Sequence, residues 1–138
     1  MAKYARETEV PAERSRNEIE QTLKKYGATA FGYGWQDNAA IVVFEFKGRR
    51  MKFVLPLPNP KETKAKSLEP ETRRRWRSLL LSIKAKLVTV DDGISTVETE
   101  FMGHIVLPNG MTVSEWMHPQ IESSYRDGKM PPLLGSGG

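Results

Sequence analysis

The sequence predicts an α+β fold in which a three-stranded antiparallel meander packs against a central amphipathic helix. Residues 30–58 carry the strand pattern. Aromatic residues alternate with glycine in F-G-Y-G-W, and two β-branched and aromatic runs follow after the turn sequences Q-D-N and K-G-R-R. Residues 70–90 carry the helix pattern, because apolar residues recur there with the helical period. A chain of 138 residues is long enough for one sizeable core.

The helix over residues 70–90 is the element around which the other predicted elements are arranged. Pro70 lies near its first turn, where a missing backbone N–H costs little, and Asp91-Asp92-Gly93 supplies a glycine C-cap. Its predicted apolar stripe consists of Trp76, Leu79, Leu80, Ile83, Leu87 and Val90. Positive charge lies along both margins of that stripe, with Arg73, Arg77 and Lys84 on one side and Arg75 and Lys86 on the other.

Ahead of the sheet, the sequence predicts a flexible tail over residues 1–10 and then a first helix. Pro11 occupies a favoured first helical position, and Gly27 occupies the position of a C-terminal glycine. Ile19, Leu23 and Tyr26 fall on one face between them. The first helix therefore has a narrow apolar stripe.

Side chains of the first strand alternate between the two faces of the sheet. Phe31, Tyr33 and Trp35 therefore share one face, and Gly32 and Gly34 share the other. Because glycine leaves room for close approach to the backbone, we expect a helix on the glycine face. The pattern leaves open whether the aromatic row lies in the core or on the surface.

After the third strand, a proline- and lysine-rich surface loop leads to the central helix, and shorter helices follow it. The sequences S-T-V-E at 95–98 and T-V-S-E at 112–115 have the spacing of capping boxes, and N-G at 109–110 predicts a tight turn between them. Pro119 is expected to end or kink the last helix. We expect one α+β domain over residues 11–134, with G-S-G-G at 135–138 resembling an added linker.

Composition excludes several classes of function. The chain has no cysteine, so disulfides, thiolate catalysis and cysteine-ligated metals are excluded. His104 and His118 are the only histidines and lie in separate segments, so we expect no metal site; we also expect no cofactor. No Ser-His-Asp arrangement, Walker loop or dinucleotide fingerprint is present. No apolar run approaches the roughly 20 residues of a membrane span, so we expect a cytoplasmic protein without a membrane partner.

The net charge of +4 conceals a strongly basic middle segment. Residues 47–87 carry 13 basic and 3 acidic side chains, a net of +10, whereas residues 1–46 have a net of −1 and residues 88–138 a net of −5. A focused basic patch attracts polyanions more strongly than the same charge spread evenly. The alternative is that these are two solvated faces and a lysine-rich loop.

Aromatic side chains beside basic ones are typical of proteins that bind single-stranded nucleic acid, because rings stack on bases and cations neutralise phosphates. The alternative is that the aromatic row is core beneath the central helix. The residues predicted to bind nucleic acid are Tyr33, Trp35, Lys47, Arg49, Arg50, Lys52, Arg73, Arg74, Arg75 and Arg77.

A catalytic alternative depends on Asp37, Glu45 and Lys47. A carboxylate followed by Glu-x-Lys on a strand is the pattern of restriction-endonuclease-like nucleases, in which two acids hold Mg²⁺ beside the attacking water. Asp37 falls in the predicted turn, and Glu-x-Lys arises by chance in charged sequences. We therefore expect no catalytic residues and no enzyme activity.

Several blocks of the sequence resemble a family of small bacteriophage and prophage proteins that carries no assigned activity. The blocks are F-G-Y-G-W at 31–35, F-V-L-P-L-P at 53–58, R-R-R-W-R-S-L-L-L-S-I-K-A-K-L at 73–87 and H-I-V-L-P-N-G-M-T-V-S-E-W-M at 104–117. The resemblance implies a phage context, in which small proteins serve DNA metabolism or disable host defences. It assigns no role to any residue.

The first functional hypothesis is non-catalytic binding of nucleic acid, with single-stranded DNA or RNA favoured over duplex. The second is a phage counter-defence protein in the host cytoplasm that binds a host protein complex or sequesters a nucleotide signal. Trp116, Met117 and Tyr125 would then form an exposed anchor patch, and a homo-oligomer is compatible with this reading.

Overall fold

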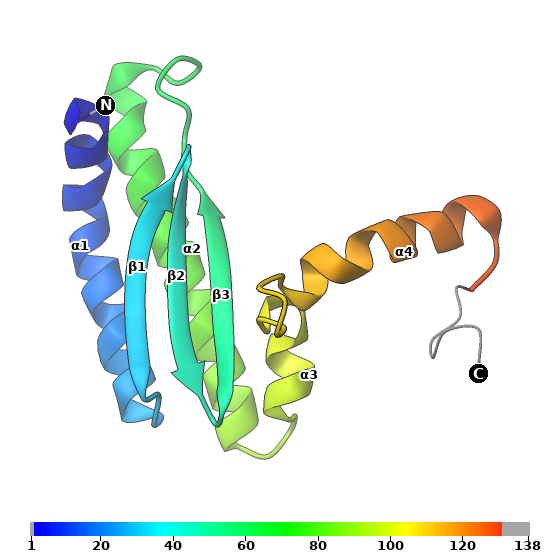
Figure 1. Ribbon diagram of the computed structural model, residues 1–138. Helices are drawn as coiled ribbons and strands as arrows, with labels where there is room; N and C mark the ends of the chain where they lie inside the picture. Colours follow the sequence, from blue (N-terminus) through cyan, green and yellow to red (C-terminus); the bar gives the residue numbers. More distant parts are fainter. Residues whose placement is uncertain (1, 131–138) are drawn as a thin grey trace.

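The computed structural model describes the backbone of residues 2–130 and the side chains of residues 12–130 (Figure 1). It confirms an α+β fold with a three-stranded antiparallel sheet. The expected linker at 135–138 lies outside the described residues. In chain order the elements are α1 (Ala2–Lys25), β1 (Ala30–Gln36), β2 (Ala39–Phe46), β3 (Arg49–Pro56), α2 (Ala65–Asp91), α3 (Val97–Phe101), the 3₁₀ turn η1 (Met102–His104) and α4 (Val113–Asp127).

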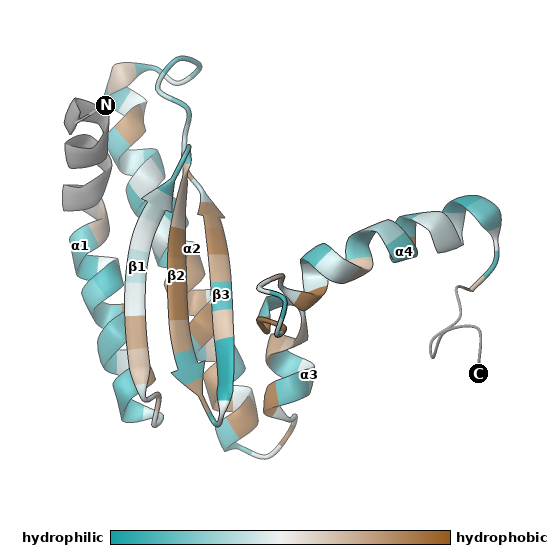
Figure 2. Ribbon diagram, in the orientation of Figure 1, coloured by the Kyte–Doolittle hydropathy of each residue, from teal (hydrophilic) through white to brown (hydrophobic). Residues whose placement is uncertain are grey.

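The sheet is the predicted meander, with strand order β1-β2-β3 and both pairs antiparallel. Its register places Phe44 of β2 opposite Phe31 on one side and Met51 on the other. The central strand β2 is the most hydrophobic of the three (Figure 2). Its side chains alternate as predicted, so that Val42 and Phe44 are buried on one face while their neighbours lie on the other.

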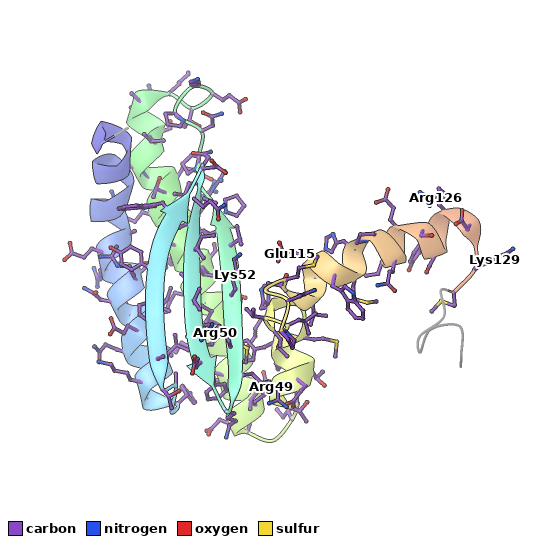
Figure 3. All side chains as sticks on the ribbon, in the orientation of Figure 1. Arg49, Arg50, Lys52, Glu115, Arg126 and Lys129 are labelled. Carbon is purple, nitrogen blue, oxygen red and sulfur yellow. The ribbon has the colours of Figure 1, made fainter. Side chains whose placement is uncertain are left out.

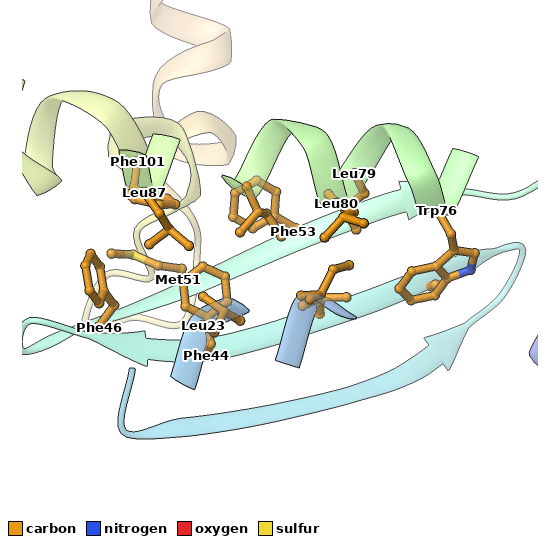
Figure 4. Close-up of a cluster of buried hydrophobic side chains, with 14 of the residues drawn as sticks. Leu23, Phe44, Phe46, Met51, Phe53, Trp76, Leu79, Leu80, Leu87 and Phe101 are labelled. Carbon is orange, nitrogen blue, oxygen red and sulfur yellow. The ribbon is translucent and has the colours of Figure 1, made fainter. Parts of the chain in front are cut away.

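Helices α1 and α2 cover one face of the sheet and run in the same direction along it (Figure 1). The stripe of α2 is buried as predicted, except that Val90 is only partly buried. The side chain of Phe101 in α3 packs in the core against three other phenylalanine rings. The buried cluster between helices and sheet includes Leu23, Phe44, Phe46, Met51, Phe53, Trp76, Leu79, Leu80, Leu87 and Phe101 (Figure 4).

Helix α1 begins at Ala2, so the prediction of a flexible tail over residues 1–10 is wrong for the backbone that the structure describes. Residues 2–9 are rich in alanine, arginine, lysine and glutamate, which are strong helix formers. Pro11 lies inside the helix, where it removes one backbone donor without ending the element. Pro119 likewise lies inside α4 rather than at its end.

The expectation of a helix on the glycine face of β1 is also wrong. A methyl group built on Gly32 or Gly34 would meet no atom within 4 Å, so nothing packs against these glycines. Figure 1 shows α1 and α2 on the opposite side of the sheet, with the front of the sheet uncovered by helices among the described residues. The sheet therefore has one buried face and one open face.

Beyond α2, the chain turns back along β3 and then leaves the domain. The hydroxyl of Thr96 caps α3, one residue later than predicted, by accepting from the Thr99 amide at 3.1 Å. The capping box of Thr112 and Glu115 is confirmed at the start of α4. From this start α4 projects away from the body of the molecule (Figure 1).

Candidate nucleic-acid interface

A basic groove of about 610 Å³ lies between α1 and α2. Its floor is partly apolar, because Leu80 and Leu81 of α2 contribute to it, and its walls carry mostly positive charge. The groove is lined by Arg14, Ser15, Glu18, Pro70, Arg73, Arg74, Arg77, Leu80, Leu81 and Lys84.

The helical period explains how these cations come together. Arg73, Arg77 and Lys84 are four and seven residues apart, so they lie along one side of α2 beside its buried stripe. Arg14 and Glu18 are one turn apart on α1, which packs lengthwise against α2. Two long helices that run side by side thus place cations on both walls of one groove.

The groove cations differ in how they are paired. Arg73 donates to Glu69 at 2.7 Å, and Arg74 is paired with Glu71. Among the described side chains, Arg14, Arg77 and Lys84 take part in no ion pair. Exposed ion pairs contribute only about 0–1 kcal/mol, so a phosphate group can replace the carboxylates with little loss.

Arg75 lies on the opposite margin of α2 and has a structural role. It donates to Glu71 at 2.9 Å and to the Pro56 carbonyl at 3.0 Å, which ties α2 to the end of β3. The hydrogen bonds from Arg75 and then Arg74 hold the pKa of the Glu71 carboxyl below its usual range. Of the predicted arginines on α2, only Arg73, Arg74 and Arg77 line the groove between the helices.

The basic residues of the β2–β3 hairpin form a separate cluster. Arg49 pairs with Glu98 at 3.3 Å and Arg50 pairs with Glu45 at 3.0 Å. Figure 3 shows Arg49 and Arg50 at one end of β3, with Lys52 further along it. The cluster comprises Lys47, Arg49, Arg50 and Lys52.

Arg75 and the hairpin cluster lie at opposite ends of β3. Arg75 bonds to Pro56 at the last residue of that strand, and Arg49 is its first residue. A strand of this length spans roughly 23 Å at about 3.3 Å per residue. The ten residues predicted from the sequence therefore do not form one site.

Tyr33 and Trp35 lie on the helix side of the sheet, at its β1 edge. Their cross-strand partners Val42 and Ala40 are buried, yet Tyr33 is 37% exposed and Trp35 is 48% exposed. The two rings meet edge to face with centroids 6.3 Å apart, and the Arg16 guanidinium lies 4.0 Å from the centre of the Tyr33 ring. The side chains of Tyr33 and Trp35 are thus only partly buried.

The aromatic row and the hairpin cation Lys52 lie on different faces of the sheet. Lys52 pairs with Val43 across the sheet and so lies on the open face, whereas Tyr33 and Trp35 lie on the helix face. The cations on their own side come from α1. Arg14 and Arg16 were not predicted, because residues 1–46 have a net negative charge and only the packing of α1 reveals which cations it presents.

The nuclease pattern is not assembled. Asp37 lies in the β1–β2 turn with a φ of 55°, whereas Glu45 and Lys47 lie at the other end of β2. Six residues of β2 (39–44) lie between the two carboxylates, a separation of roughly 20 Å along the strand. Among the side chains of residues 12–130, no group of three or more histidine or acidic residues is placed to hold a metal ion.

No protein-family model, curated protein or solved structure matches this chain. The site must therefore be interpreted from its own geometry. No helix within residues 2–130 is long and apolar enough to cross a membrane.

Proposed function

We propose that this protein binds nucleic acid without catalysing a reaction, and that the groove between α1 and α2 is the main binding surface. The observation that carries the proposal is the convergence of Arg14, Arg73, Arg74, Arg77 and Lys84 on one groove, to whose described lining Glu18 contributes the one carboxylate. A row of cations along a groove is suited to a chain of phosphates, and such contacts supply most of the affinity of non-specific binding.

Single-stranded DNA or RNA is the favoured ligand. Trp35 and Tyr33 lie beside α1 on the side away from the groove, and Trp35 has about half of its surface accessible. A single strand that follows the groove and crosses α1 can stack a base on this ring, which a base inside a duplex cannot do. The apolar floor at Leu80 and Leu81 offers further contact for a base or sugar.

The proposal is tested by two double variants that change the charge equally. One is Arg77→Glu with Lys84→Glu in the groove, and the other is Arg49→Glu with Arg50→Glu at the hairpin. Affinity for a labelled single-stranded oligonucleotide is measured by fluorescence anisotropy. We expect the groove variant to lose at least tenfold in affinity and the hairpin variant to lose much less.

The matched control separates a local site from a general effect of net charge. Equal losses in both variants would show that charge alone attracts the nucleic acid. A larger loss in the hairpin variant would place the binding surface at the other end of β3 and contradict the proposal.

The alternative function is that of a phage counter-defence protein, and one observation favours its protein-binding form. Trp116 and Tyr125 on α4 are exposed, as expected of an anchor patch, although Met117 is only partly so. Capture of a small nucleotide would use the same basic groove, and no separate observation favours it. Capture of a protein by α4 leaves the basic groove unexplained.

A further inference from the structure

Helix α4 carries an apolar stripe that nothing in the described part of the chain covers. Trp116 and Ile121 are each 50% exposed and Tyr125 is 87% exposed, and no residue of α4 is fully buried. Val113, Met117, Ile121 and Tyr125 recur every four residues and form one stripe, and Trp116 lies at its margin, on the far side from Tyr125. An amphipathic helix of this kind is stabilised mainly by packing its apolar side against a partner.

The start of α4 is fixed in a direction that leads away from its own sheet. The Val113 amide donates to the Ile105 carbonyl at 3.0 Å, and Thr112 pairs with Val106 in a short antiparallel bridge. The capping box of Thr112 and Glu115 then sets the first turn. Figure 1 shows the helix departing from the side of β3, so its far half cannot reach the front of the same sheet without breaking these bonds.

The open face of the sheet is the complementary surface; the described part of the chain borders it only along its β3 side, where Glu115 at the start of α4 lies beside Lys52 and Val54. One cross-strand row is Gly34, Ile41 and Val54, and the next row brings Gly32 beside Val43. The glycines leave a shallow trough along β1, beside apolar side chains of β2 that are only partly buried. A helix can lie in such a trough because backbone can be approached closely there.

We propose that a second copy of this chain covers this face, with α4 of each copy lying on the open sheet face of the other. The exchange is two-fold symmetric, so the apolar stripe of α4 and the open sheet face are covered in both copies at once. The exposed parts of Met117, Ile121 and Tyr125 amount to roughly 300 Å² on the scale of large side chains. Counting the sheet surface that they cover and both symmetric contacts gives roughly 1,200 Å², at the lower end of the range for specific interfaces.

The charges of the two surfaces are of opposite sign. Glu115 lies beside Lys52 of its own chain. The rest of α4, residues 116–127, carries two carboxylates and one arginine, a net of −1, whereas Glu45, Arg50 and Lys52 give the open face a net of +1. In Figure 3 Arg50 and Lys52 lie along β3, and Arg126 lies at the far end of α4. Opposite charge favours exchange between copies over alignment of like elements, such as two α4 helices side by side.

The experiment measures molar mass by size-exclusion chromatography with light scattering for the wild type and three variants. Ile121→Lys alters the apolar stripe of α4, and Val54→Lys alters the open face of the sheet. Ile94→Lys introduces a lysine at an exposed site outside both surfaces. We expect the wild type and Ile94→Lys to be dimers, and the two interface variants to have dissociation constants raised at least tenfold. Circular dichroism checks that each variant is folded.

Mixing the two interface variants distinguishes the exchange of α4 between copies from other assemblies. A mixed pair retains one intact contact, between the unaltered α4 of one copy and the unaltered face of the other, so we expect mixed dimers to form. A dimer that Ile121→Lys disrupts but Val54→Lys does not would indicate pairing of α4 with α4 and would overturn the proposal. A monomeric wild type at about 100 µM would also overturn it, and would leave α4 to a partner of another kind.

Discussion

At the residue scale, the proposed function depends on the partly exposed ring of Trp35 and on the cations Arg77 and Lys84. Arg77 and Lys84 have no ion-pair partner among the described side chains, whereas Arg49 and Arg50 each have a carboxylate within 3.3 Å. A cation that already has a carboxylate partner gains less when a phosphate arrives, because it must give up that contact. We therefore expect the groove to be the stronger anion site of the two.

Trp35 is expected to act as a stacking platform. Replacement by alanine should lower the affinity for single-stranded oligonucleotide by roughly 5- to 100-fold, since stacking on an aromatic ring is worth about 1–3 kcal/mol per base. Trp35→Phe keeps a ring and should retain most of the affinity in the same anisotropy assay. Equal binding by Trp35→Ala and the wild type would exclude the ring from the interface.

His104 should make the stability of the fold depend on pH. Its ring stacks on Phe53 with centroids 3.7 Å apart. Burial and the positive charge of Lys86 lower the pKa of His104, and a hydrogen bond to the backbone of Lys52 opposes the shift only in part. The unfolded state then binds this proton more readily than the folded state, so the free energy of unfolding should fall as pH drops below about 6.5.

Urea unfolding at pH 7.5 and at pH 5.5 measures this effect. We expect His104→Phe, which keeps an aromatic ring on Phe53, to lose the part of the pH dependence that falls in this window. His118→Gln is the matched control and should keep it. A pH dependence that is identical in His104→Phe and the wild type would show that His104 does not contribute.

At the element scale, the shortest helix makes one of the most important contributions to the core. Phe101 of α3 is fully buried and contacts Phe44, Phe46 and Phe53 edge to face, with ring centroids 6.0–6.3 Å apart. A five-residue helix has little stability of its own. Its position is therefore maintained by this side chain and by the Thr96 cap.

Phe101→Ala should destabilise the protein by about 3–5 kcal/mol, because it removes a buried ring and leaves a cavity among three others. The exposed neighbour Met102 offers the control, and Met102→Ala should change the free energy of unfolding by no more than about 0.5 kcal/mol. Urea denaturation monitored by tryptophan fluorescence measures both. Similar small losses in the two variants would mean that α3 is peripheral to the core.

The elements that could be predicted from sequence are those determined by local pattern. The alternation of Val42, Phe44 and Phe46, the stripe of α2 and the capping box at Thr112 all follow from neighbours close in sequence. The sequence did not predict that α1 and α4 continue through Pro11 and Pro119, because a single missing backbone donor does not decide where a helix ends.

At the scale of the whole molecule, adjacency in sequence was a poor guide to the site. The cations of residues 47–87 form one block in the sequence, but β3 carries the chain from one end of the sheet to the other and divides them. Arg14 joins Arg77 and Lys84 only because α1 and α2 pack side by side. Such grouping depends on tertiary packing, which residue spacing does not contain.

The measurement that tests the central claim most directly is the salt dependence of binding to a single-stranded oligonucleotide. The slope of the logarithm of affinity against the logarithm of salt concentration is about −0.7 per phosphate neutralised. We predict that Arg77→Ala with Lys84→Ala makes this slope shallower by about 1.4, whereas Arg49→Ala with Arg50→Ala leaves it nearly unchanged. An unchanged slope in the groove variant, or a wild type whose binding is insensitive to salt, would contradict the assignment of the groove as the nucleic-acid interface.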